Sequence, residues 1–432
     1  MHFAVRGYFL VALIALLALA GTWSDDPAFA TGWIFPAVFL LGGLAVEAWY
    51  ARGTQVTLAM RIAQRLKLGR GVTGQFVFAH NRRRAQRLQY ARALPESFRQ
   101  NTQVREIELP ADAERRDGIE LMPLLLGAGR FGPVPARLLG RFSLAWWSRE
   151  LPRDDAFMVA PDSLPRGARP IAGESAGETP RRVPGAGVEL LQLREYVSGD
   201  ALSRIDWKAT ARRGALIARE YSEAQHLEIL MVIDAGRASR VRAGELDRLG
   251  LYANVAARLA EHAVSVEDRV GVLVYADRVL TSSLPDRGVR AVSRLRRALE
   301  TLQAERGDSD PLAAALHVRK LLRHRGLVVW LTDLADPVRN EALAQAVKAL
   351  MPRHQPIIAA PHAAEIGRLA DRPLTEWRDP AVALVAREHR DRAQRQVAEL
   401  RRRGVVVLDE ADDALDRAAL DAYLQLRRRR RV

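Results

Sequence analysis

The sequence predicts an α/β protein in which two transmembrane helices and a small β-sandwich-like domain precede a parallel sheet flanked by helices. Two long apolar runs lie within the first fifty or so residues, and short apolar segments separated by turn residues follow them. From about residue 225, apolar runs alternate with helical stretches, which is the pattern of a parallel sheet. A chain of 432 residues, 48% apolar, is long enough for two or three such domains.

The N-terminal region, residues 1–52, is expected to form a transmembrane hairpin. Its apolar runs cover residues 8–23 and 33–50, close to the roughly 20 residues that cross a bilayer. Acidic Asp25 and Asp26 lie between the runs, and basic residues follow the second run, at Arg52, Arg61, Arg65, Lys67 and Arg70. The positive-inside rule therefore places both ends in the cytoplasm. We expect Glu47 at the headgroup level.

An alternative is a signal peptide cleaved after Ala28-Phe29-Ala30, a small-x-small sequence. We disfavour it because the second apolar run would then translocate the basic flank.

Residues 53–161 are expected to form the β-sandwich-like domain, with strands near residues 74–79, 104–109, 119–126 and 157–159. The stretch from Gly127 to Gly132 satisfies the pattern GxGxxG, but Pro133 and Pro135 would obstruct the helix that a dinucleotide site requires. We therefore interpret these glycines as a turn. Residues 162–187, rich in Pro, Gly, Ser and Ala, predict a linker.

Residues 225–432 are expected to form the parallel sheet. Asp234 follows the apolar run 227–233, and Asp333 follows the run 327–332. Because the carboxyl ends of parallel strands meet at one edge, where ligands bind, we expect both aspartates on that edge. Asp310 is expected to cap a helix that begins at Pro311. Exposed helix faces are expected to carry Arg248, Arg258, Arg294 and Arg297.

A signature segment, residues 188–224, contains the densest mixture of charged and aromatic side chains. Such a mixture indicates a packed segment in which ion pairs fix the register. Nearby arginines and a lysine would keep its carboxylates ionised, which argues against an acid/base pair. The residues that define the signature are Arg194, Glu195, Tyr196, Gly199, Asp200, Arg204, Asp206, Trp207, Lys208 and Arg212.

This segment resembles the signature of the domain of unknown function 58 family, Leu-Arg-Glu-Tyr-x-x-Gly-Asp followed by Arg-x-Ile-Asp-Trp-Lys-Ala-x-Ala-Arg. Ser198 stands where the family usually has proline. The resemblance implies a bacterial inner-membrane protein that acts with a MoxR-type AAA+ ATPase in the assembly or maturation of other proteins.

The C-terminal domain resembles the von Willebrand factor type A fold, whose metal-ion-dependent adhesion site uses an Asp-x-Ser-x-Ser loop, a threonine and a further aspartate. Here Gly236 and Ala238 replace both serines, so the site is degenerate. The resemblance implies Asp234, Ser309 and Asp333 as the remaining Mg²⁺ ligands. These side chains are too few to complete the six oxygen ligands that Mg²⁺ prefers. Arg237 is expected to pair with Asp234 or Asp333 in place of the cation. We therefore expect no cofactor, with Mg²⁺ as the open alternative.

The function expected is protein binding rather than catalysis. Partner contacts are expected at the sheet edge, at Asp234, Arg237, Ser309 and Asp333. The sequence has no cysteine and none of the catalytic motifs HExxH, GxSxG or GxxxxGK[ST].

Two alternatives stay open. One is a metal-dependent or carboxylate-dependent membrane-bound enzyme. The other is a binder of nucleic acid or anionic lipid, suggested by the net charge of +15 and the five arginines at residues 427–431. We expect no specific nucleic-acid partner, because no aromatic-rich platform accompanies the basic tail.

Overall fold

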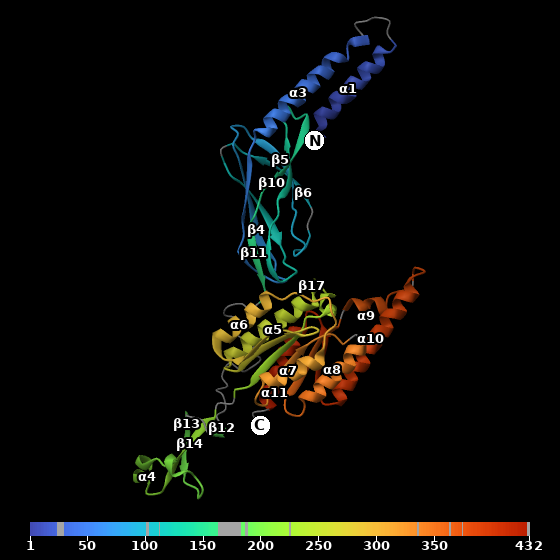
Figure 1. The fold of residues 1–432 in the computed structure, drawn as a ribbon. Helices are drawn as coiled ribbons and strands as arrows, with labels where there is room; N and C mark the ends of the chain where they lie inside the picture. The colour runs from blue at the N-terminus through green and yellow to red at the C-terminus, as the bar shows by residue number, and fades with distance from the viewer. Residues whose placement is uncertain are drawn as a thin grey trace. The chain divides into compact units, whose positions relative to one another are not determined.

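The computed structural model describes residues 1–23, 30–100, 103–111, 113–162, 183–185, 189–223, 226–334, 337–362, 364–373 and 375–429. They form a mixed α/β structure with several sheets (Figure 1). The chain divides into two compact units, Met1–Ala160 and Pro161–Val432, and each is described by itself.

Two apolar helices, α1 (Val5–Gly21) and α3 (Ile34–Arg52), lie side by side in the first unit (Figure 1). Of the helices in the described residues, only α3 is long and apolar enough to cross a membrane. The 17 residues of α1 form a shorter apolar helix, so the second predicted span is not confirmed. Asp25, Asp26 and the alternative cleavage site at residues 28–29 lie outside the described residues.

Three sheets make up the rest of this unit. The first has the order β1 (His2–Phe3), β10 (Ala145–Leu151), β9 (Val134–Leu139), β5 (Gln86–Ala91) and β6 (Val104–Leu109). The second has the order β2 (Val56–Arg61), β4 (Val72–His80) and β7 (Arg115–Leu121), and the third β3 (Arg65–Lys67), β11 (Ala156–Ala160) and β8 (Gly127–Arg130). The strands expected near residues 74–79, 104–109 and 157–159 are confirmed, whereas the one expected at 119–126 ends at Leu121.

Aromatic side chains pack between these sheets. Phe78 of β4 lies 4.9 Å from Tyr90 of β5, centroid to centroid, and Phe131 lies 4.6 Å from Phe157 of β11. The interpretation of the glycines at 127–132 as a turn was wrong for the first four residues, which form β8, antiparallel to β11. Gly129 is required there because a Cβ atom would overlap the Phe157 ring.

Glu47 joins α3 to the turn between β9 and β10. Its side chain is fully buried against the protein, and the expected position at the headgroup level stays a prediction. Its carboxylate accepts hydrogen bonds from the backbone N–H groups of Phe142 (2.8 Å), Leu144 (3.0 Å) and Ala145 (3.1 Å). The buried carboxyl oxygens are accommodated because the turn presents several N–H donors to them.

The second unit is built on a six-stranded sheet with the order β19 (Val279–Asp286), β18 (Arg269–Tyr275), β15 (Glu228–Asp234), β20 (Leu327–Leu331), β21 (Gln355–His362) and β22 (Val406–Ala411). All neighbours are parallel except β18 and β19. Numbered along the chain from β15, this order is 3-2-1-4-5-6, the doubly wound arrangement. Its topological switch point lies between β15 and β20, where ligands of such sheets bind.

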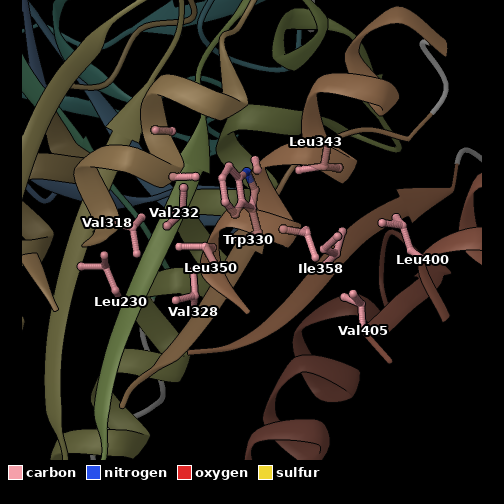
Figure 2. Close-up of a cluster of buried hydrophobic side chains, with 14 of the residues drawn as sticks. Leu230, Val232, Val318, Val328, Trp330, Leu343, Leu350, Ile358, Leu400 and Val405 are labelled. Carbon is pink, nitrogen blue, oxygen red and sulfur yellow. The ribbon is translucent and has the colours of Figure 1, made fainter. Parts of the chain in front are cut away.

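Helices cover both faces of this sheet. α5 (Arg248–Ser265) contacts α6 (Gly288–Glu300) and α11 (Leu415–Arg429), and α8 (Pro337–Leu350) contacts α7 (Pro311–Leu321) and α10 (Asp379–Arg402). Apolar side chains of α7, α8 and α10 pack on the sheet around Leu230, Val232 and Trp330 (Figure 2). Asp310 caps α7, as predicted, by accepting hydrogen bonds from Leu312 and Ala313 N–H.

The signature segment consists of β13 (Glu189–Glu195), a short 3-10 helix (Leu202–Arg204), α4 (Trp207–Arg213) and β14 (Ile217–Glu223). β12 (Val183–Gly185) pairs with β14 and lies inside the predicted linker, most of which falls outside the described residues. The remaining short elements of the unit are a 3-10 helix (Arg237–Arg240), β16 (Arg242–Ala243), β17 (Leu246–Asp247) and α9 (Ala364–Ala370).

Candidate functional site

Asp234 ties three segments together at the switch point of the sheet. Its side chain is buried, and its Oδ1 accepts hydrogen bonds from Gly236 N–H (2.9 Å) and from the Ser309 hydroxyl. Its Oδ2 accepts a hydrogen bond from the Thr332 hydroxyl at 2.8 Å. The loops after β15 and β20 therefore meet at one edge of the sheet, and the loop of Ser309 joins them.

Asp333, the next residue after Thr332, forms a buried ion pair with Arg248. Asp333 Oδ2 lies 2.8 Å from Arg248 Nη1, and the two side chains are only 9% and 6% exposed. Arg248 is the first residue of α5, so it is not on an exposed helix face, contrary to the expectation. Two charges this deeply buried are tolerated because each neutralises the other.

Arg237 does not make the contact predicted for it. Its guanidinium lies 2.9 Å from Asp308 Oδ1, and both side chains are about two-thirds exposed. The prediction that Arg237 pairs with Asp234 or Asp333 was therefore wrong, and Arg248 takes that role for Asp333. Arg237 belongs to the 3-10 helix that follows the Asp234 loop, which directs it to the loop of Asp308 instead.

The residues at this edge do not fit a magnesium site. The Asp234 carboxylate already accepts hydrogen bonds from one amide and two hydroxyl groups, and Asp333 is neutralised by an arginine. Mg²⁺ needs near-octahedral oxygen ligands. Arg248 opposes the binding of a cation, because it places a fixed positive charge beside the Asp333 carboxylate. Within the described ranges no group of three or more His, Asp or Glu side chains could hold a metal ion.

A pocket of about 1020 Å³ opens beside the Arg248–Asp333 pair. It is bordered by the carboxyl ends of β20 and β21, by β22, and by α9 and α10, with Leu334, Leu369 and Ala393 among its apolar lining residues. Polar groups on its wall are also paired, because Arg390 lies 3.1 Å from the Asp371 carboxylate and the His362 ring lies 3.5 Å from the Asp409 carboxylate. An apolar pocket with fixed charges suits recognition of a ligand surface.

The signature charges form an internal network. Arg194 makes a two-pronged contact with Asp200, at 2.7 and 2.8 Å, and its Nε lies 3.2 Å from Glu220. Asp206 caps α4 by accepting a hydrogen bond from Ala209 N–H at 3.0 Å, and it pairs with Arg219 at 2.9 Å.

These contacts keep both aspartates ionised. The guanidinium of Arg194 holds the pKa of Asp200 below its usual value. For Asp206, the hydrogen bond from Ala209 N–H is the main cause of a lowered pKa, followed by Arg219. Neither carboxyl group is therefore suited to act as a general acid near neutral pH.

Other signature residues face solvent or shape the backbone. Trp207 is 66% exposed on α4, and Lys208 and Arg212 of the same helix are also exposed. Gly199 has a φ of +112°, which favours glycine, and the Tyr196 hydroxyl donates to the Asp200 carbonyl at 3.3 Å. Glu195 is exposed, and Arg204 is half-buried.

The C-terminal arginines are not a uniform basic tail. Arg427 lies on α11, donates a hydrogen bond to the Val266 carbonyl at 3.0 Å and lies 3.6 Å from the buried Asp268. Arg427 is therefore part of the folded unit and not of a free basic tail. Residues 430–431 lie outside the described residues.

Two residues of the edge, Thr332 and Arg248, were not predicted as site residues. The sequence does hold a signal for Arg248. It directly follows Asp247, the N-cap of α5, which accepts a hydrogen bond from Gly250 N–H at 2.7 Å. An arginine in the first turn opposes the helix dipole and so indicates a nearby acid. Thr332 carries no such signal, because a threonine at the end of an apolar run is ordinary strand sequence.

Residues 192–404 match the family model described as "Protein of unknown function DUF58", which supports the DUF58 family for this chain. The uncharacterized protein Rv1480 of Mycobacterium tuberculosis and the uncharacterized protein Mb1516 of Mycobacterium bovis are similar to it. Each is 26% identical over 175 residues, which cover 40% of this chain and 54% of the relative. The chain thus spans about half the length of the curated relatives it matches.

Proposed function

We propose, on the premise of the DUF58 match over residues 192–404, that this chain is a membrane-anchored interaction scaffold. It is held in the bacterial inner membrane by α1 and α3, and its soluble parts face the cytoplasm. It acts with a MoxR-type AAA+ ATPase in the assembly or maturation of other proteins. The apolar character of α3 supports the anchor.

The pocket of about 1020 Å³ at the carboxyl edge of the sheet is the observation that carries this proposal. Its apolar walls and paired charges support binding, because catalysis by acid and base needs carboxylates that can change protonation. A membrane-bound enzyme that uses these carboxylates is therefore less well supported. Nucleic-acid binding loses support because Arg427 is engaged inside the fold.

We further propose that the second unit is von Willebrand type A-like and recognises its partner without a metal ion. The strand order 3-2-1-4-5-6 supports this fold, and the Arg248–Asp333 pair supports metal independence. Asp234, Ser309 and Asp333 are each less than 10% exposed, so we assign them to shaping the edge. Arg237, which is exposed, stays a predicted partner contact.

Filling the pocket tests this function. Ala393 lines it from α10, whereas Ala398 is an exposed alanine of the same helix outside the pocket lining. The detergent-solubilised full chain is coexpressed with the MoxR-type ATPase of the same organism, and the amount of ATPase that copurifies is measured. We expect Ala393→Trp to reduce capture at least tenfold, because tryptophan occupies the space that the partner enters. Ala398→Trp should leave capture unchanged.

Two outcomes count against the proposal. If the unmodified chain captures no ATPase, the scaffold role is lost. If both tryptophan variants capture as much ATPase as the unmodified chain, the pocket is not the binding site.

A further inference from the structure

A second cavity, in the first unit, lies between α1 and α3 beside the turn that Glu47 holds. It measures about 910 Å³, and its walls are mainly apolar, with Phe9 and Leu10 from α1 and Phe39 and Val46 from α3. Phe9 and Phe39 are each about 70% exposed although both are large and apolar. Such an apolar surface is matched by an apolar occupant, and around membrane helices that occupant is lipid.

Glycine keeps this groove open. Gly42 and Gly43 of α3 both line it, and a Cβ atom placed on Gly42 would meet nothing within 4 Å. Glycine inside an apolar helix lowers helix propensity, so two in succession need a reason other than helix formation. At Gly43 that reason is close packing, because a Cβ atom there would lie 2.8 Å from Leu144 Cδ1. At Gly42 the space is left free.

Two arginines also line the groove. Arg6 precedes Phe9 by one turn of α1, and Arg141 lies in the turn between β9 and β10. Both are exposed, and within the described part of the chain neither guanidinium forms an ion pair. The Arg6 guanidinium donates one long hydrogen bond, 3.5 Å, to the Phe142 carbonyl.

Glu47, the acid in this region, does not neutralise them. Its carboxylate oxygens accept hydrogen bonds from the backbone N–H groups of Phe142, Leu144 and Ala145. The two arginines thus leave positive charge beside an apolar groove, at the end of two helices that we place in a bilayer.

We propose that this groove binds one anionic phospholipid, with an acyl chain against Phe9, Phe39 and Gly42 and the phosphate between Arg6 and Arg141. The inference rests on the proposed membrane anchor. A free phosphate ion would contact the two guanidinium groups but not the apolar walls, and an apolar helix of another protein would leave both guanidinium groups without an anion. A phospholipid satisfies both requirements, because basic pockets between membrane helices bind anionic headgroups and guanidinium groups bind phosphate oxygens well.

Native mass spectrometry of the full chain in mild detergent tests the site. The protein is offered equal amounts of phosphatidylglycerol and phosphatidylcholine with the same acyl chains, and bound lipid is counted. We expect one retained phosphatidylglycerol, favoured over phosphatidylcholine by roughly tenfold or more, since each arginine adds to the attraction. The double variant Arg6→Gln/Arg141→Gln should lose this preference, and Gly42→Leu should lose bound lipid of both kinds.

Arg52→Gln is the matched control, because Arg52 is an arginine at the end of α3 that does not line the groove. It should retain the preference. The site is refuted if the unmodified chain binds both lipids equally, if the double variant keeps its preference, or if inorganic phosphate displaces the lipid. It is also refuted if a second copy of the chain occupies the groove in place of lipid.

Sedimentation with membranes is measured in parallel for every variant. An unmodified chain that sediments with membranes but shows no lipid preference would refute the groove alone, whereas an unmodified chain that fails to sediment would refute the membrane anchor. Thermal unfolding of each variant shows whether the β-sheets remain folded. This measurement distinguishes misfolding from a specific loss of lipid binding.

Discussion

Arg248 and Asp333 have charges that depend on each other, because both side chains are almost inaccessible to water. Arg248→Ala would leave Asp333 as a buried, unneutralised carboxylate, and we expect the free energy of unfolding of the second unit to fall by about 3–5 kcal/mol. Replacing both residues, as Arg248→Met/Asp333→Leu, should recover most of this loss. Urea denaturation measures the effect.

Arg237→Ala is the control for this comparison, because its ion pair with Asp308 is exposed on both sides. We expect it to change the free energy of unfolding by less than about 1 kcal/mol. Equal effects of Arg237→Ala and Arg248→Ala would contradict the expectation that the buried pair stabilises the second unit more than the exposed pair does.

At the scale of single elements, one carboxylate of α3 holds the turn between β9 and β10. Glu47→Ala would leave buried N–H groups of the β9–β10 turn without acceptors, each at a cost of about 1–3 kcal/mol. We expect a lower Tm of the first unit in detergent and faster proteolysis at residues 140–145. Glu114→Ala, at a half-exposed glutamate of the same unit, should change neither measurement. An unchanged Tm in Glu47→Ala would show that the turn does not depend on this side chain.

Elements with a strong local pattern were predictable from the sequence. The apolar run 227–233 forms β15, and Asp310 before Pro311 caps α7. Both structures depend mainly on residues that are adjacent in the sequence. Gly129 could not be assigned in this way. Its role depends on the Phe157 ring, which the sequence places 28 residues away and the sheet brings into contact.

The candidate site was predictable in part, for the same reason. The two apolar runs, with the rule that carboxyl ends of parallel strands share an edge, placed Asp234 and Asp333 at one edge, where the structure has them. The pairing of Asp333 was not predictable from spacing, because Arg248 and Arg237 are both basic residues close to Asp234 in sequence. Only the fold determines that the first turn of α5 meets Asp333 while Arg237 meets Asp308.

For the whole molecule, the net charge of +15 proves less informative than its distribution. Arg248 and Arg427 are engaged inside the second unit, and Arg194 is held in the signature network. Arg6 and Arg141, by contrast, stand beside an apolar groove. The arginines without an acid, rather than the total charge, therefore indicate where an anionic ligand would bind.

Each unit has its own core, so we expect two separate unfolding transitions by calorimetry of the full chain in detergent. Phe157 packs against Phe98 and Phe131 in the first unit, and Leu350 is fully buried in the second (Figure 2). Phe157→Ala and Leu350→Ala each remove a buried apolar side chain, at a cost of about 2–5 kcal/mol. Each variant should lower one transition by roughly 5–15 °C and leave the other in place. A single transition that both variants shift would instead mean that the two cores unfold as one cooperative unit.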